Sequence, residues 1–295
     1  MKMINKLRLL WEFLCIFIVV PVTSQTQPEA YRLYDGKGRV VDYDQLVKTI
    51  AKVDVVFIGE IHNCAITHWL ELKLLDSLYK IHGKKLKVGM EMFESDNQLV
   101  LDEYLHGQIT GDRFEEEMRL WPNYSTDYAS LISYARDHNI PIVATNIPRR
   151  YATAVKEHGL SYLDSFSMEA KAYMAPLPIH FQTNESVEQG FVLMGLMGKN
   201  KNVNSRQIAE AQAIKDATMA WRIAKNLQEK FIHFNGNFHT DNHEGIIPYL
   251  LQYKPETTYM VVRAVRQENI LRLEDEYKGI ADFYICVPED MTTSY

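Results

Sequence analysis

Short apolar runs alternate with longer segments of helical periodicity along most of the chain. The runs are rich in β-branched and aromatic residues, as buried strands are. They cover residues 53–59, 86–90, 140–144, 231–234, 258–263 and 281–287. Strands that alternate with helices favour a parallel sheet covered on both faces. The predicted fold class is therefore α/β, with a largely parallel central sheet flanked by helices.

The segments between the runs carry the apolar spacing of helices. Ile66, Leu70, Leu74 and Leu78 recur every four residues and form the buried stripe of one helix. A helix over residues 205–229 would, at about 1.5 Å per residue, be long enough to cross a whole domain. Further helices are predicted at 43–53, 97–105, 112–119 and 128–138, and a β-hairpin at 31–41.

Residues 151–204 lack strand signals. This segment contains several methionines, and glycines gather in its later part. We expect it to form a smaller helical subdomain, inserted into the α/β domain and ending in a loop.

The first 24 residues have a different pattern from the rest of the chain. Lys2, Lys6 and Arg8 precede an apolar run at 9–22, and small residues follow at 22–24. This pattern predicts a secretory signal peptide over residues 1–24, so the domain at 25–295 would be extracytoplasmic. The alternative is a membrane anchor, but the run is shorter than the roughly 20 residues that a spanning helix needs.

Composition sets further limits on the class of protein. With 295 residues, of which 46% are hydrophobic, the chain can bury a sizeable core. Its net charge of -6 leaves no basic stripe, which argues against a nucleic-acid partner. Cys64 and Cys286 are the cysteines beyond the signal peptide. They could form one disulfide or remain two free thiols, so the fold does not depend on a disulfide framework.

Polar residues follow four of the predicted strands. Glu60 and His62 follow the first, Glu91 the second, Asn146 the third and His239 the fourth. Parallel strands would bring these residues to one cleft at the edge of the sheet. A lone glutamate after a strand more often caps a helix or pairs with a cation, but such a coincidence at four strands is harder to accept. Glu60, Glu91 and Asn146 are thus candidate catalytic residues, and His62 and His239 candidate ligands of a divalent metal.

Five blocks of sequence carry a resemblance to a known family. They are Gly59-Glu60-Ile61-His62, Glu91-Met92-Phe93, Asn146-Ile147-Pro148-Arg149, the stretch Gln212 to Met219 with Asp216, and Gly236-Asn237-Phe238-His239. In order and approximate spacing the chain resembles the ChaN-like haem-binding uptake proteins, whose superfamily includes the TraB and Tiki proteins and the erythromycin esterases. The resemblance runs from about Val53 to Leu250.

The resemblance implies an extracytoplasmic haem-binding protein, in the periplasm or associated with the outer membrane, that acts in haem and iron uptake. It implies haem (iron protoporphyrin) as the cofactor, an outer-membrane haem receptor as a candidate partner, and a homodimer closed by the ligand. Members are often lipoproteins, but the residues before Cys15 do not form a good lipobox.

Haem requires an apolar slot, an axial ligand and cations for its propionates. In and beside the helical insertion, the candidate contacts are Tyr151, His180, Met194 and Met197, with Arg149 and Arg150 for the propionates. Methionines more often fill a core than bind haem, and the two arginines could equally form a solvated helix face.

A metal-dependent hydrolase of the same superfamily, an esterase or a peptidase, is the alternative function. In that case His62 and His239 would bind a divalent metal or activate water, and Glu60 or Glu91 would be the general base. A third alternative is a binding module that has kept the cleft without turnover.

Overall fold

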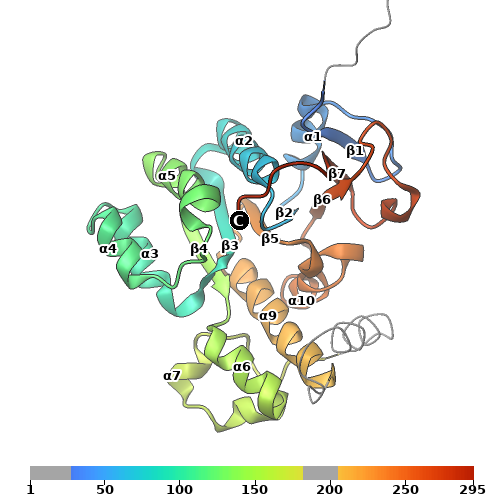
Figure 1. Ribbon diagram of the computed structural model, residues 1–295. Helices are drawn as coiled ribbons and strands as arrows, with labels where there is room; N and C mark the ends of the chain where they lie inside the picture. Colours follow the sequence, from blue (N-terminus) through green and yellow to red (C-terminus); the bar gives the residue numbers. More distant parts are fainter. Residues whose placement is uncertain (1–27, 182–204) are drawn as a thin grey trace, which may run out of the picture.

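A seven-stranded sheet forms the centre of the computed structural model, which describes residues 28–181 and 205–295 (Figure 1). The predicted signal peptide, Met194 and Met197 lie outside these ranges. The strand order is β1-β7-β6-β2-β5-β3-β4, and β1 alone runs antiparallel to its neighbour. The predicted α/β class with a mostly parallel sheet is confirmed. The strands are β1 (Arg32–Asp35), β2 (Val55–Glu60), β3 (Leu86–Glu94), β4 (Ile142–Asn146), β5 (Lys230–Gly236), β6 (Tyr259–Gln267) and β7 (Phe283–Pro288).

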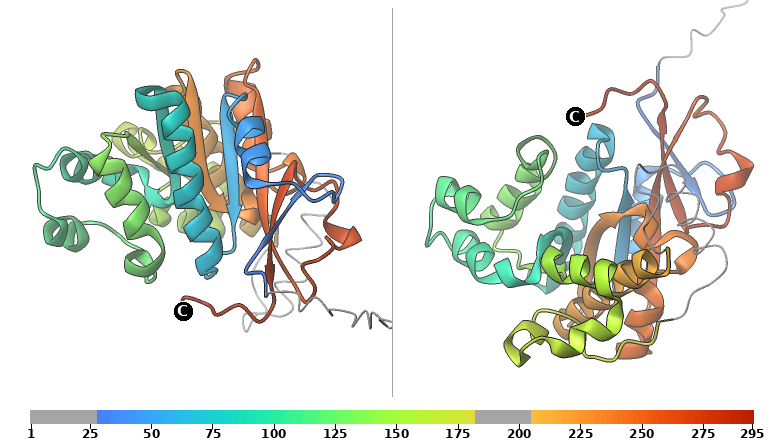
Figure 2. Two further views of the ribbon diagram at one scale, coloured as in Figure 1. Left: turned by 90° about the horizontal axis from the view of Figure 1, so that it is seen from above. Right: turned by 60° about the horizontal axis from the view of Figure 1, so that its bottom comes forward.

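Helices cover both faces of this sheet (Figures 1 and 2). On one side lie α1 (Tyr43–Ile50), α2 (Ala65–His82), α3 (Gln98–Leu105), α4 (Gly111–Glu117) and α5 (Ala129–Asp137). On the other side lie α6 (Arg149–His158), α7 (Met168–Lys171), α9 (Ser205–Asn226) and α10 (Ile246–Tyr253).

Each face of the sheet has its own hydrophobic core because side chains alternate along a strand. In β2, Val56 and Ile58 belong to the cluster that includes α2 and α5. Val55 and Phe57 belong to the cluster that includes α9 and α10. All six residues of β2 are buried, and β2 lies between two parallel neighbours. The central strand is therefore a rigid support for the residues at its carboxyl end.

The start of the described chain follows its prediction only in part. The hairpin expected at 31–41 is short: Tyr34 and Val40 form an antiparallel bridge, flanked by backbone hydrogen bonds from Asp35 to Arg39 at 2.9 Å and from Val41 to Leu33 at 3.0 Å. The carboxylate of Asp35 accepts hydrogen bonds from the backbone amides of Lys37 and Arg39, at 3.0 and 2.9 Å, and this closes a tight turn. The first strand instead pairs along its length with β7, which is distant in sequence, so a local pattern could not reveal it.

The segment predicted to form a helical subdomain contains α6, the 3-10 turn η4 (Leu160–Ser165) and α7, and both α6 and η4 contact α9. Its predicted later part, from 182 to 204, lies outside the described residues. Cys64 and Cys286 are both buried and free, which is the two-thiol alternative. Within residues 28–181 and 205–295, none of the helices combines the length and apolar character needed to cross a bilayer.

Candidate functional site at the carboxyl edge of the sheet

A pocket of about 610 Å³ opens where β2 and β5 end. Its wall includes four residues that the sequence placed at strand ends: Glu60, His62, Glu91 and His239. The parallel order of β2, β5 and β3 explains why they meet, since the carboxyl ends of parallel strands share one edge. The remaining lining comes from the loops after β2 and β5, from α9 and from the end of the chain: Ile61, Asn63, Gln212, Lys215, Gly236, Asn237, Phe238 and Tyr295.

Glu60 is buried at the end of β2 and orients His62. Its Oε1 atom accepts a hydrogen bond from the Tyr128 hydroxyl at 2.5 Å and lies 2.7 Å from Nδ1 of His62. Burial alone would raise the pKa of Glu60, but His62 and His68 outweigh it and lower that pKa. Burial alone would lower the pKa of His62, but Glu60 outweighs it and raises that pKa. Glu60 therefore stays ionised and His62 is more basic than a free histidine.

Glu91 and Asp216 hold the second histidine from both sides. Nε2 of His239 lies 3.2 Å from Oε1 of Glu91, and Nδ1 lies 2.5 Å from Oδ1 of Asp216. The other Glu91 oxygen accepts a hydrogen bond from the backbone amide of Gly236 at 2.8 Å. Asp216 comes from α9, and it belongs to one of the blocks of family resemblance although the site prediction did not include it.

These contacts fix the charges of the buried triad. Burial would lower the pKa of His239, but the Glu91 and Asp216 carboxylates outweigh it and raise the pKa to about 10. Burial would raise the pKa of Glu91, but His239 outweighs it and lowers the pKa to about 2. The pKa of Asp216 is raised by its burial. Near neutral pH the pocket thus contains an imidazolium paired with the Glu91 carboxylate.

Two glycines in the blocks of family resemblance, Gly59 and Gly236, lie so close to neighbouring side chains that a Cβ atom would not fit. A Cβ atom at Gly236 would lie 2.7 Å from Nε2 of His62. A Cβ atom at Gly59 would lie 2.6 Å from Oδ1 of Asn237. Both distances are shorter than non-bonded contacts allow, so a side chain at either position would displace a residue of the pocket wall.

Asn146 supports the pocket from its edge. Its Nδ2 atom donates to the backbone carbonyl of Glu91 at 3.0 Å, which ties the end of β4 to β3. Its Oδ1 atom is buried without a hydrogen-bond partner, and the residue is not part of the pocket wall.

A second layer of polar residues lies behind Glu60. Nδ1 of His68 lies 3.0 Å from Oε2 of Glu71 and 3.8 Å from Oε2 of Glu60. In the described chain, these three residues form the one group of histidine, cysteine and acidic side chains whose ligand atoms converge closely enough for a metal ion, within 4.8 Å of one another. Neither His62 nor His239 belongs to it. The sequence prediction missed His68 and Glu71, although their spacing of three residues on a helix is a signal for a shared face.

A backbone carbonyl links this layer to the pocket. Nε2 of His68 lies 3.1 Å from the carbonyl oxygen of His62, and Nδ2 of Asn123 donates to the same oxygen at 2.9 Å. Asn123 also donates to Asp127 at 2.7 Å, and Asp127 accepts from the Ser294 hydroxyl at 2.6 Å. The C-terminal segment, red in Figure 1, thus crosses from β7 to the pocket region.

The predicted haem contacts that the structure describes lie away from this pocket. Tyr151 is buried in α6, where its ring packs on Phe166 and its hydroxyl accepts from Arg150 at 3.1 Å. Arg150 also pairs with Asp96 at 2.5 Å, and Arg149 is largely exposed. Tyr151 and both arginines therefore do not line the edge of the sheet.

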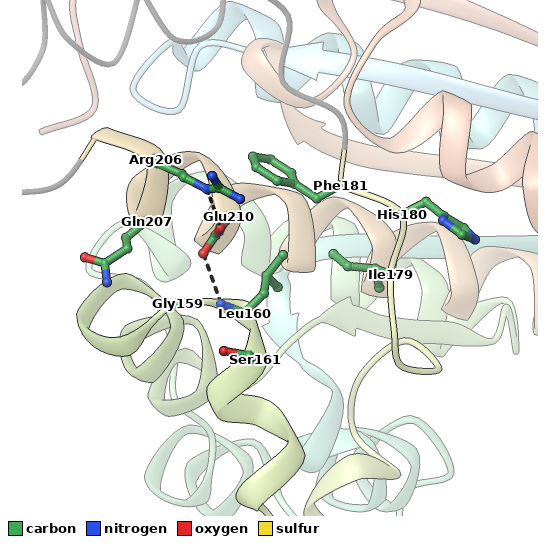
Figure 3. A pocket seen from close by; sticks show the side chains of 9 residues that line it. All are labelled: Gly159, Leu160, Ser161, Ile179, His180, Phe181, Arg206, Gln207 and Glu210. Carbon is green, nitrogen blue, oxygen red and sulfur yellow. Dashed lines mark hydrogen bonds and ion pairs between the residues drawn. The ribbon is translucent and has the colours of Figure 1, made fainter.

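His180 lines another pocket, of about 710 Å³, between η4 and α9 (Figure 3). Leu160, Ile179 and Phe181 supply apolar walls, and Arg206 lies on α9. In this pocket, Glu210 accepts hydrogen bonds from Nε of Arg206 and from the backbone amide of Leu160, each at 3.0 Å.

The fold and the pocket together define a class of protein: an α/β domain with two glutamate–histidine pairs at the carboxyl edge of a mostly parallel sheet. A family model described as "Haem-binding uptake, Tiki superfamily, ChaN" matches residues 46–250. Since this span is more than half of the 295 residues, the chain belongs to that family.

A solved ChaN structure shares the fold of this chain. The chain is similar to the structure described as "Cofacial heme binding to ChaN of Campylobacter jejuni", with a TM-score of 0.66 and 18% identity, over 86% of this chain and 96% of that one. An erythromycin esterase mutant, EreC, gives a TM-score of 0.45 at 12% identity, over 88% of this chain and 83% of that one.

A curated relative is the protein RETICULATA-RELATED 5, chloroplastic, of Arabidopsis thaliana. It is 22% identical over 276 residues, which are 85% of this chain. The match spans 37% of the plant protein's length.

Proposed function

We propose that this protein binds haem outside the cytoplasm and acts in haem and iron uptake. The observation that carries the proposal is the match of residues 46–250 to a family described by haem-binding uptake. The ChaN protein of Campylobacter jejuni, which shares the fold, is described as binding haem cofacially.

The pocket between η4 and α9 fits a haem group better than the pocket at the sheet edge. Its volume of about 710 Å³ lies in the range of ligand pockets, about 300–1,000 Å³. Leu160, Ile179 and Phe181 provide the apolar contacts that a porphyrin needs, and Arg206 provides a cation for a propionate. The sheet-edge pocket instead concentrates buried charge.

His180 is the candidate axial ligand, because its side chain is exposed whereas the hydroxyl of Tyr151 is buried and bonded to Arg150. In Figure 3 the imidazole points away from Ile179 and Phe181, so the side chain would have to turn toward the pocket to bind the iron. Ligation by Tyr151 would require breaking that contact and moving Arg150 from Asp96. A bound haem would supply the iron centre, and His180 would hold it through an imidazole nitrogen.

A titration of the purified protein with haemin tests this function. We expect a saturable shift of the Soret band, lost in His180→Ala and retained in His158→Ala, an exposed histidine on α6. No shift at micromolar haemin would contradict haem binding. A shift that survives His180→Ala but disappears in Tyr151→Phe would instead assign the ligand to Tyr151.

The location and partners follow from the same proposal. The signal-peptide pattern at residues 1–24 supports an extracytoplasmic location, in the periplasm or at the outer membrane. An outer-membrane haem receptor would then supply the ligand, and a second copy of the chain would cover the exposed haem face. Cell fractionation tests the location, and light scattering with and without haemin tests the homodimer.

A second candidate function is hydrolysis at the sheet-edge pocket. The observation that favours it is the position of His62: Glu60 binds its Nδ1 atom, so that Nε2 remains to take a proton from water. The side chain is 38% exposed, and the pocket also holds the His239 imidazolium, which could stabilise a developing negative charge.

Assays against panels of ester and peptide substrates test this second function. Under it, His62→Gln and Glu60→Gln abolish turnover, whereas His180→Ala leaves it unchanged. The two functions are separable because the two pockets share no lining residue.

A further inference from the structure

Glu60 and Glu71 each present a buried oxygen that has no hydrogen-bond donor. Both side chains are fully buried, with 2% and 0% of the residue exposed. Oε2 of Glu60 and Oε1 of Glu71 have no hydrogen-bond partner. Tyr128 and His62 both bind the other oxygen of Glu60, so Oε2 is left for a different contact. A buried carboxylate oxygen without a donor is costly, and a positive species beside it would remove that cost.

The backbone fixes which nitrogen of His68 can face this position. Nε2 lies 3.1 Å from the carbonyl oxygen of His62, and a carbonyl oxygen can only accept a hydrogen bond. Nε2 therefore carries a proton, and Nδ1 faces Glu71 and Glu60, where it would offer a lone pair once a metal ion displaces its proton. An imidazole oriented through its second nitrogen by a carbonyl is the arrangement typical of metal ligands.

The spacing of these atoms is that of ligands around a small cation. Bonds of about 2.1 Å in tetrahedral geometry place ligand atoms about 3.4 Å apart. The observed separations from Nδ1 of His68 are 3.0 Å to Oε2 of Glu71 and 3.8 Å to Oε2 of Glu60, which lie on either side of that value. One ligand atom from each of the three residues lies within 4.8 Å of the other two, so small rotations of the side chains would bring them to ligand geometry.

We propose that Glu60, His68 and Glu71 bind one divalent transition-metal ion behind the sheet-edge pocket. One imidazole and two carboxylates suit Zn²⁺, Fe²⁺ or Mn²⁺ better than Ca²⁺, which prefers six to eight oxygen ligands. The ion would bind Oε2 of Glu60 on the side away from the pocket. It would thereby fix the orientation of Oε1, which contacts Nδ1 of His62. This inference does not depend on haem binding, because His180 and the pocket around it contribute no ligand.

A proton shared by the two carboxyl groups is the competing occupant of the same position. Such a proton would form a hydrogen bond between one oxygen of Glu60 and one of Glu71, and the protein would then contain no metal at this position. The two occupants therefore differ in elemental content and in the sensitivity of the fold to chelators.

The test uses the untagged full chain, expressed with added Zn²⁺, Fe²⁺ and Mn²⁺ and purified without chelator. We expect about one equivalent of a divalent metal in the native protein, and a lower Tm after unfolding and refolding in EDTA. Glu71→Gln and His68→Gln should weaken Zn²⁺ binding by more than about 100-fold, which is beyond the effect of outer-shell changes. Glu94→Gln, at a buried acid outside the cluster that pairs with Arg119, should keep the full metal content.

Two results would overturn the proposal. One is native protein that holds less than a tenth of an equivalent of any divalent metal. The other is a folded Glu71→Gln variant that retains the wild-type content. Should both ligand variants fail to fold, X-ray absorption of the Zn²⁺-loaded wild type decides: one imidazole with oxygen ligands at about 2.0–2.2 Å supports the site, and sulfur ligands or several imidazoles contradict it.

Discussion

Nε2 of His239 lies 3.2 Å from Oε1 of Glu91. His239 comes from the turn after β5, whereas Glu91 comes from β3. Nδ1 of the same ring meets Asp216 of α9. A neutral imidazole has one proton, so it cannot donate to carboxylates on both sides. The charged ring therefore links three elements of the fold at the pocket, and this buried ion pair is the electrostatic centre of the site.

The first prediction concerns Asp216, which holds the far side of that ring. In Asp216→Asn, the imidazolium loses one of its two carboxylates while the shape of the side chain is kept. Breaking a buried charge pair in this way should lower the free energy of unfolding by about 3–5 kcal/mol at neutral pH, as measured by urea denaturation. The exposed Asp137 is the control: Asp137→Asn should change stability by less than about 0.5 kcal/mol. Equal free energies of unfolding for the two variants would show that the contact between Asp216 and His239 does not stabilise the folded protein.

The pH dependence of folding should carry the signature of the Glu91–His239 pair. The pKa of His239 is raised to about 10, so its contribution is complete below about pH 6.5 and is lost as the pH rises through about 10. The pKa of Glu91 is lowered to about 2, so its contribution is complete above about pH 4.5 and is lost as the pH falls through about 2. The pair therefore stabilises most between about pH 4.5 and 6.5.

Urea denaturation of wild type and His239→Gln at about pH 5.5, 7.5 and 9.5 measures this effect. The free energy of unfolding of the wild type should fall more steeply with rising pH than that of the variant. Parallel pH profiles would indicate that His239 is neutral in the folded protein.

Gly236 should tolerate no side chain because His62 occupies the space beside it. In Gly236→Ala, the new methyl group would lie 2.7 Å from Nε2 of His62, and the ring or the strand end must move. We expect a cost of about 1–3 kcal/mol in thermal or urea unfolding, together with a changed His62 signal in NMR. Gly111→Ala is the matched control, since the nearest atom to its Cβ lies at 3.9 Å. The prediction is wrong if both alanines are tolerated equally.

Lys230 joins β5 to the end of α1 from a buried position. Its Nζ atom donates to the carbonyl oxygen of Ile50 at 2.6 Å and also to that of Val53. Lys230→Met keeps the apolar stem but leaves two backbone carbonyls without a hydrogen-bond donor. The free energy of unfolding, measured by urea denaturation, should therefore fall by about 1–3 kcal/mol. Lys80→Met, at an exposed ion pair, should have an effect of less than about 1 kcal/mol.

The sequence predicted the parallel sheet and the meeting of Glu60, Glu91 and His239, since both depend on strands whose patterns are local and strong. Each strand end could be found from its own apolar run. Parallel order then brings these ends together. Asn146 lies at the same edge, but it binds the backbone of β3 rather than lining the pocket.

Other residues of the site were outside the reach of such patterns. Tyr128 and Asp127 come from a π-helical turn at 124–128, whose spacing differs from that of an α-helix, and the helix predicted at 128–138 included Tyr128 only as its first residue. His68 and Glu71 lie beside the apolar stripe of α2, where polar residues usually face solvent. Their burial depends on how α2 packs over the end of β2, and this is a tertiary contact that the local sequence does not encode.

The protonation state of His239 tests the central electrostatic claim most directly. Histidine side-chain NMR of the native protein, with His239→Gln for assignment, gives the pKa of this ring. The account predicts that both ring nitrogens remain protonated at pH 8, since Glu91 and Asp216 raise the pKa of His239 to about 10. A ring that loses its proton with a pKa near the ordinary value of about 6.5 would contradict it.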